Sequence, residues 1–352
     1  MARPESMATV AGAGFIALDI LLPSAEDRQL RRRAGGTCGN VLAILSFLGH
    51  TAVPIARLGT DEAADCLISD LMSAGVDCQH VQRDPSGRTP RVVEFLPEQR
   101  GAPHRFSFTC PKCRRRFPKR SEPIYEQGDD SIYRVNPRLF FFDRSGPTTT
   151  KLAMKAREQG ALVMFEPYSL GTNTNFTEAL QLSDIVKYSG RRTRQSIEPW
   201  LASVDSKPSL VIETLDSDGL RYMTRSRVSK LNWQHQEPFL VESPVDQAGA
   251  GDWFSAGLIS RLLATSSSDR WRERTVERAL VFGQSLAAAS ILFEGPRGYL
   301  EKSSRRSVLR ASLSTIRRGR LPDWIAQDTD IPGDSSGFET LDGACVFCLA
   351  PV

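Results

Sequence analysis

The sequence predicts an α/β fold in which a mostly parallel sheet is covered by helices on both faces. Short apolar runs of strand length alternate along the chain with longer helix-like segments, several of which end at a glycine. Repeated strand–helix units favour parallel strands, because each crossover helix returns the chain to the same end of the sheet. With 352 residues, of which 40% are hydrophobic and 24% charged, the chain can bury a large core.

The first third of the chain contains three expected strands and two expected helices. The strands are apolar runs at Thr9–Ala17, Ala52–Arg57 and Arg91–Leu96. The helices are Asn40–Leu48 and Ala63–Ala74, and the glycine that follows each of them suits a helix C-terminus.

A polar segment of residues 97–133 interrupts this alternation. It is rich in Pro, Arg and Lys, and it carries the closely spaced pair Cys110 and Cys113. Such a composition is typical of irregular structure, so we expect an inserted loop or a small subdomain here.

The alternation then returns and continues toward the C-terminus. The expected strands are Leu139–Phe142, Leu162–Phe165, Ile185–Lys187 and Leu210–Thr214. The expected helices are Thr149–Gln159, Trp253–Leu263 and Val276–Phe293. We therefore expect one core domain of residues 1–320, which contains the insert, and an acidic tail of residues 321–352. In such sheets, ligands bind beyond the carboxyl ends of the strands.

Bulk properties exclude several classes of protein. The net charge of +4 is too small to indicate a nucleic-acid partner, because such partners need basic residues gathered on one face. No apolar stretch reaches the length of a membrane span, and no basic leader precedes the first apolar run, so we expect a cytoplasmic protein. Seven cysteines are an odd number, which argues against a disulfide scaffold. Cys38, Cys66 and Cys78 are interpreted as small buried residues.

A run of small residues leads into the expected helix at Trp253. Gly249, Ala250 and Gly251 carry no bulky side chain, so their backbone N–H groups can approach an anion at the positive end of that helix. Asp252 follows directly, and a carboxylate beside an anion hole is what phosphoryl transfer to a hydroxyl requires. The alternative is a glycine-rich turn before a helix, with Asp252 only favouring the helix dipole.

A second small-residue motif lies far upstream. Gly35 and Gly36 permit a tight turn and a close backbone approach, and Asn40 offers a donor and an acceptor to a polyol. A simple turn followed by a helix cap is the alternative interpretation.

The two motifs, in this order, resemble the signatures of the ribokinase-like (PfkB) carbohydrate kinase family. Gly249–Asp252 is similar to the end of its Asp-Thr-Thr-Gly-Ala-Gly-Asp motif, and Gly35–Asn40 is similar to its Gly-Gly-x-x-x-Asn segment. The resemblance implies a ribokinase-like fold with a small lid, Asp252 as catalytic base, Gly249–Gly251 as anion hole, and Gly35, Gly36 and Asn40 as sugar-binding residues.

Weaker matches follow the same family order. Asp19 stands where members carry a substrate-binding aspartate, and Thr214–Gly219 resembles the nucleotide segment, with Asp216 in place of a glycine. The resemblance thus implies ATP and Mg²⁺, with Thr214, Asp216 and Gly219 on the nucleotide side.

The sequence departs from the family on the phosphate side. Lys187-Tyr188-Ser189 resembles a variant seen in fructokinase-like branches, but Arg191 and Arg192 stand where acidic residues are expected. A cation cannot bind a metal, although an arginine can hold a phosphate directly. Glu166-Pro167 similarly resembles the family's Asp-Pro-Asn-x-Arg, with Tyr168 and Leu170 replacing its Asn and Arg. We expect Arg192 to act on phosphate.

Three hypotheses of function follow. The first is an ATP- and magnesium-dependent kinase that phosphorylates a hydroxyl of a sugar or nucleoside. The sequence decides neither which acceptor it uses nor whether the protein is a homodimer. The second is a kinase-like binding or regulatory protein with reduced catalysis, which the arginines after Ser189 favour. The third is a scaffold whose basic insert binds nucleic acid or a partner, and a solvated loop is its simpler alternative. The basic residues of the insert are Lys112, Arg114, Arg115, Arg116, Lys119 and Arg120.

Two cysteine pairs share the same spacing, one in the insert and one in the tail. Cys110, Cys113, Cys345 and Cys348 therefore form the set we expect to bind a structural Zn²⁺ ion, because two-residue spacing lets both thiolates of a pair reach one tetrahedral metal. The insert is basic and the tail is acidic, which favours their approach. Two unrelated pairs, as thiols or as redox-active cysteines, are the alternative.

Overall fold

The structure is a computed structural model that describes residues 8–22, 30–95, 105–117, 134–171, 174–326, 344–345, 347 and 350–351. None of the helices in these ranges is both long and apolar enough to cross a membrane.

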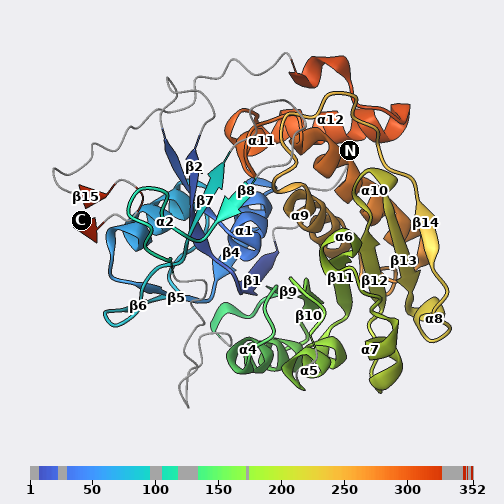
Figure 1. The fold of residues 1–352 in the computed structure, drawn as a ribbon. Coiled ribbons are helices and arrows are strands. Elements are labelled where there is room, and N and C mark those ends of the chain that lie inside the picture. The colour runs from blue at the N-terminus through green and yellow to red at the C-terminus, as the bar shows by residue number, and fades with distance from the viewer. Residues whose placement is uncertain are drawn as a thin grey trace.

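The central element is an eight-stranded sheet with the strand order β14-β13-β12-β11-β10-β9-β1-β4 (Figure 1). Its strands are β1 (Thr9–Ala13), β4 (Thr51–Pro54), β9 (Leu139–Phe142), β10 (Leu162–Phe165), β11 (Ile185–Ser189), β12 (Leu210–Thr214), β13 (Leu220–Thr224) and β14 (Gln234–Gln236). The strands from β4 to β12 pair in parallel, and β13 and β14 are antiparallel additions at one edge. The prediction of a mostly parallel sheet is confirmed.

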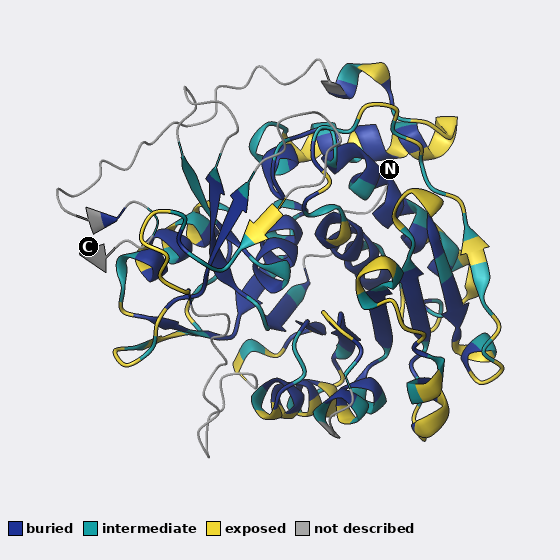
Figure 2. Ribbon diagram, viewed as in Figure 1, coloured by how far each residue is buried: buried dark blue, intermediate teal, exposed yellow. Residues whose placement is uncertain are grey.

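Helices cover both faces of this sheet, because its central strands are apolar on both sides (Figure 2). In β9, Leu139 and Phe141 belong to one core cluster, whereas Phe140 and Phe142 belong to the other. The first face is covered by α1 (Thr37–Phe47), α9 (Ala250–Leu263), α10 (Glu273–Ser290) and α12 (Arg305–Arg318). The second is covered by α4 (Pro147–Glu158), α5 (Thr174–Leu182), α7 (Glu198–Ser203) and α8 (Arg225–Val228).

A second, smaller sheet has the order β3-β2-β7-β8 and lies to one side of the central sheet (Figure 1). Its strands are β2 (Ala17–Leu22), β3 (Arg31–Gly35), β7 (Arg91–Phe95) and β8 (Arg105–Ser107). Beside it, β5 (Ala56–Gly59) pairs with β6 (Val81–Asp84), and α2 (Glu62–Ser73) contacts β2 and β3. Strand β8 lies inside the insert expected at residues 97–133.

Two expected strands are divided in the structure. Thr9–Ala17 breaks after Ala13, because Gly14 has φ 156° and a Cβ there would lie 1.8 Å from Asp143 Oδ1. Ala52–Arg57 breaks at Ile55, so that β4 joins the central sheet and β5 pairs with β6 instead. In both places the chain passes from one sheet to another. Such a change of sheet depends on tertiary structure, so an apolar run in the sequence does not reveal it.

Candidate active site

The helix α9 begins at Ala250, three residues before the expected start at Trp253, so Ala250 and Gly251 belong to its first turn. Gly249 has φ 75°, a left-handed conformation, and a Cβ there would lie 2.5 Å from Pro296 Cα. Glycine is therefore required for the chain to turn into the helix at Ala250. The turn leaves the N-terminal end of a 14-residue helix facing the site.

Asp252 lies in the first turn of α9 and is buried. Its Oδ2 accepts a hydrogen bond of 2.8 Å from Nδ2 of Asn40, which comes from α1. Burial raises the pKa of Asp252 to about 8, and the charge of Glu166 adds to this, while Lys187, Asn40 and Arg192 act in the opposite direction. The two sequence motifs, 212 residues apart, thus meet in one direct contact.

A buried ion pair lies beside the start of α9. Lys187 Nζ lies 2.5 Å from Glu166 Oε1 and donates a 2.9 Å hydrogen bond to the carbonyl of Gly251. Ser255 of α9 donates to the other oxygen of Glu166 at 2.6 Å. The sequence indicated Lys187 and Glu166 only as separate weak matches, and the structure joins them around the start of α9.

Asp19 belongs to β2 and lines a pocket together with Asn40. Burial raises the pKa of Asp19 to about 7, and a backbone hydrogen bond from Gly36 and the charge of Arg297 oppose this rise. A Cβ on Gly35 would lie 1.8 Å from Asp19 Oδ2, and one on Gly36 would lie 2.4 Å from the carbonyl oxygen of Phe15. The two glycines therefore make room for the carboxylate and for the turn into α1.

Glu94 is a residue of this region that sequence reasoning missed. It lies on β7 opposite Leu21 of β2, on the same face as Asp19, and it is fully buried. Neither carboxylate oxygen of Glu94 has a hydrogen-bond partner in the described part of the chain, and the same holds for Oδ1 of Asn40. Burial, followed by the charges of Asp19 and Asp246, holds the pKa of Glu94 well above its usual range. The available signal was an acidic residue within an apolar strand.

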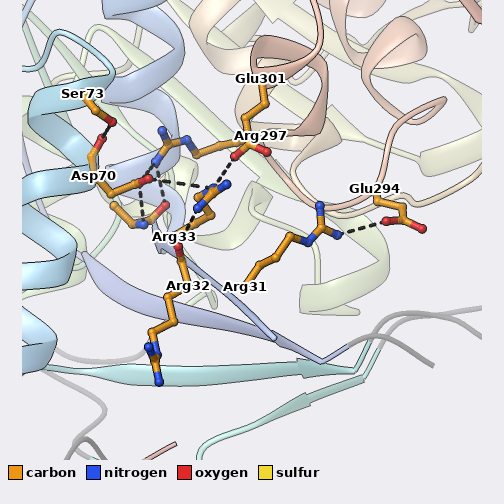
Figure 3. Close-up of polar contacts among 9 residues, drawn as sticks. Arg31, Arg32, Arg33, Asp70, Ser73, Glu294, Arg297 and Glu301 are labelled. Atoms are coloured by element: carbon orange, nitrogen blue, oxygen red, sulfur yellow. Dashed lines mark hydrogen bonds and ion pairs between the residues drawn. The ribbon is translucent and has the colours of Figure 1, made fainter. Parts of the chain in front are cut away.

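Ion pairs join β3 of the small sheet to the residues that follow α10 (Figure 3). Arg31 and Arg33 of β3 contact Glu294 at 3.0 Å and Glu301 at 2.7 Å, respectively. Arg297 contacts Asp70 of α2 and donates a 3.1 Å hydrogen bond to the carbonyl of Ala34. A narrow pocket between these groups is lined by Asp19, Asn40, Arg31, Arg33, Glu294 and Arg297.

The predicted nucleotide residues follow β12. Thr214 pairs in register with Ser189 of β11, at the carboxyl ends of the two strands. Asp216 has φ 55°, and Gly219 has φ 81° with no room for a Cβ, which would lie 2.3 Å from the carbonyl oxygen of Gln236. A glycine at position 216 would suit this backbone, so the replacement noted in the sequence is locally strained. Asp216 forms an exposed 3.2 Å ion pair with Arg191.

Arg192 lies at the edge of the site, in the short helix α6 (Gly190–Thr193). Its guanidinium and that of Arg144 lie 5.3 and 5.0 Å from the ring centre of Tyr168. A cavity of about 240 Å³ beside Tyr168 is lined also by Arg144, Gly146 and Asn175. Arg192 is among the charged groups that lower the pKa of Asp252.

Magnesium prefers oxygen ligands, usually one or two carboxylates with substrate phosphates and water. Both oxygens of Glu166 are bonded, to Lys187 and to Ser255, and the residues after Ser189 are arginines. The described residues on this side of the site therefore do not fit a magnesium ion held by the protein. A magnesium ion here would depend on phosphate and water oxygens.

The structure describes three of the four cysteines that are expected to bind zinc. The thiols of Cys110, Cys113 and Cys345 lie together, and Cys348 lies outside the described residues. Of the basic residues of the insert, Lys112 and Arg114–Arg116 are exposed, whereas Lys119 and Arg120 also lie outside the described residues.

Known proteins similar to this chain are carbohydrate kinases. Residues 18–302 match the family model described as pfkB family carbohydrate kinase. The chain is 27% identical over 303 residues to an ATP-dependent ribose-1-phosphate kinase of Halopiger xanaduensis, across 83% of this chain and 94% of that protein. It is 25% identical over 292 residues to a fructokinase of Escherichia coli, across 78% and 91%.

Solved structures agree on the fold. The fructokinase with bound ATP from Xylella fastidiosa superposes with a TM-score of 0.66 at 18% identity, over 88% of this chain and 98% of the other. The ribokinase of Arabidopsis thaliana complexed with ribose and ATP gives 0.64 at 17%, over 87% and 98%.

Proposed function

The chain belongs to the pfkB family of carbohydrate kinases, and on that premise we propose that Asp252 is the base with which it phosphorylates a sugar hydroxyl from ATP. The observation that carries the proposal is the contact of Asn40 with a buried carboxylate at the start of α9. This contact supports a site in which sugar recognition and anion binding meet at one acid–base group.

The transfer follows from these positions. The ionised carboxylate of Asp252 takes the proton of the acceptor hydroxyl, and the hydroxyl oxygen forms a bond to the γ-phosphorus. The bond from that phosphorus to the bridging oxygen breaks, and ADP leaves with its electron pair. The N-terminus of α9 and the cation of Lys187, 2.9 Å from the Gly251 carbonyl, favour the negative charge on the phosphoryl group.

Recognition of the acceptor rests on Asp19, Asn40 and Glu94. Buried polar groups are nearly always hydrogen-bonded, so the unpartnered oxygens of Asn40 and Glu94 call for donors from a ligand. Hydroxyl groups of a sugar are such donors, and two nearby carboxylates favour an acceptor with several of them. A free sugar, a sugar phosphate and a nucleoside all meet this description.

Arg192 is proposed to contact phosphate in place of the acidic residues that the family carries after the serine equivalent to Ser189. An arginine can bind phosphate through two parallel hydrogen bonds, which a metal-binding carboxylate cannot do. Its electrostatic effect on Asp252 supports this placement. A cytoplasmic location and a homodimer remain predictions from the sequence.

An ADP-release assay against fructose, ribose, ribose 1-phosphate and nucleosides tests the proposal, with wild type compared with Asp252→Asn. The variant keeps the shape of the side chain and removes the base, so turnover should fall about 10²–10⁴-fold. Asp269→Asn, on the surface before α10, is the matched control and should retain turnover. Near-wild-type turnover of Asp252→Asn would exclude this base.

A kinase-like binding protein is the second candidate, and the arginines after Ser189 favour it. It predicts that ATP and an acceptor bind to the wild type without ADP release. Isothermal titration with the same acceptors separates the two candidates.

A further inference from the structure

The first cysteine pair lies in a tight hairpin directly after β8. Thr109 and Arg116 form an antiparallel bridge, and the amide of Cys110 donates to the carbonyl of Arg115 at 2.9 Å. The amide of Cys113 donates to Sγ of Cys110 at 3.4 Å. The hairpin thereby holds both sulfur atoms on the same side of a closed turn.

The third cysteine comes from the far end of the chain. Cys345 lies in β15 (Ala344–Cys345), which pairs with β16 (Ala350–Pro351). Its Sγ is 3.6 Å from that of Cys110, 235 residues away, and the three thiol sulfurs all lie within 4.8 Å of one another. A disulfide needs about 2.05 Å, whereas two thiolates about 2.3 Å from one tetrahedral ion lie about 3.8 Å apart.

The surroundings suit a charged metal–thiolate group. Cys110 and Cys345 are buried in the main apolar cluster with Phe117, and Phe347 packs against that cluster. Three or four thiolates around a divalent cation leave a net negative charge, and the exposed basic residues of the hairpin lie directly beside it. These residues are Lys112, Arg114, Arg115 and Arg116.

The other cysteines provide a contrast. Burial raises the pKa of Cys78 to about 11 and that of Cys38 well above its usual range, so these thiols stay protonated at neutral pH. Neither lies in the three-cysteine cluster.

We propose that Cys110, Cys113 and Cys345 bind one structural zinc ion that fastens the C-terminal residues to the β8 hairpin. Each thiol loses its proton as its sulfur binds the metal. Thiolates select zinc over magnesium and calcium, and a closed tetrahedral site is typical of structural zinc. Cys348 is the fourth ligand expected from its spacing, and the proposal itself rests on the three described thiols.

The hairpin also contacts the acceptor side of the active site. Phe108 packs on Phe15 with a ring separation of 6.3 Å, and the carbonyl of Phe15 accepts from the amide of Cys38 at 3.1 Å, at the start of α1. Loss of zinc should therefore raise KM for the acceptor more than KM for ATP. This second consequence rests on the proposed kinase function, whereas zinc content does not.

Metal analysis by mass spectrometry tests the site on purified full-length protein. We expect about one zinc per chain in the wild type, in the control Cys78→Ser and in Asp252→Asn. Cys113→Ser and Cys345→Ser should lose most of the zinc, and Cys345→His, which restores a ligand, should retain it. Cys348→Ser assigns the fourth position, since loss of zinc identifies it as a ligand.

Thermal unfolding and limited proteolysis give readouts that are independent of activity. Zinc chelation should lower the midpoint of unfolding of the wild type and expose its C-terminal residues to protease, with no effect on Cys345→Ser. A metal-free wild type, a Cys110–Cys345 disulfide found by peptide mapping, or full zinc in Cys345→Ser would overturn the proposal. If Asp252→Asn is inactive but still holds zinc, the zinc site is supported independently of the kinase assignment.

Discussion

The two halves of the candidate active site differ in the ionisable side chains that they carry. The acceptor half has Asp19, Glu94 and Asp252, all buried and all with a raised pKa. The phosphate half has Lys187 within an ion pair and Arg192 at the edge. The difference supports the proposed division of labour, in which carboxyl groups bind hydroxyls and Asp252 takes a proton, while cations and the start of α9 meet phosphate.

The same comparison separates the residues that match the family motifs from those that differ from them. The base and the glycine turns resemble the family motifs, whereas the residues after Ser189 have changed from acidic to basic. In the proposed function, Arg192 binds phosphate at a place where the family pattern has acidic residues.

Reversing the charge at Arg192 should change the difference between the acceptor half and the phosphate half most strongly. Arg192→Glu places a carboxylate against phosphate, and loss of a charge-assisted contact should raise KM for ATP about 10- to 100-fold. Steady-state kinetics with varied ATP and magnesium measure this, with Arg194→Glu as the neighbouring control. Higher activity with stronger magnesium dependence would instead show that the native chain is a weakened metal-dependent kinase.

Replacing Glu94 in the acceptor half should have a smaller effect. Glu94→Gln keeps the shape of the side chain but replaces one acceptor oxygen with a donor, so KM for the acceptor should rise several-fold, about 1 kcal/mol, with KM for ATP unchanged. Glu237→Gln, whose side chain is exposed, is the control. An equal rise in both KM values would show that Glu94 acts on the fold rather than on the acceptor.

The strands of the central sheet could be predicted because each carries its own signal. Leu139–Phe142 and Leu162–Phe165 are apolar throughout, and Leu210–Thr214 begins with three apolar residues; the structure has β9, β10 and β12 at these residues. By contrast, β3 has the sequence Arg-Arg-Arg-Ala-Gly, and it is a strand because it pairs with β2 and its arginines meet partners on other elements.

The residues of the candidate site also divide into those that the sequence could predict and those that it could not. Gly249–Asp252 and Asn40 could be found because glycine, a carboxylate and an amide at those spacings have a local meaning. The role proposed for Glu94 could not, because it depends on strand register beside Asp19. The joining of Lys187 to Glu166 depends on strands β10 and β11 lying side by side.

The pH dependence of turnover tests the central claim most directly. A base must be ionised to act, so kcat/KM for the acceptor should rise with pH as Asp252 loses its proton and level off above an apparent pKa of about 8. The residual turnover of Asp252→Asn should lack this rise. A wild-type profile that is flat between about pH 6 and 9, or the same rise in Asp252→Asn, would contradict the assignment of a buried carboxylate base.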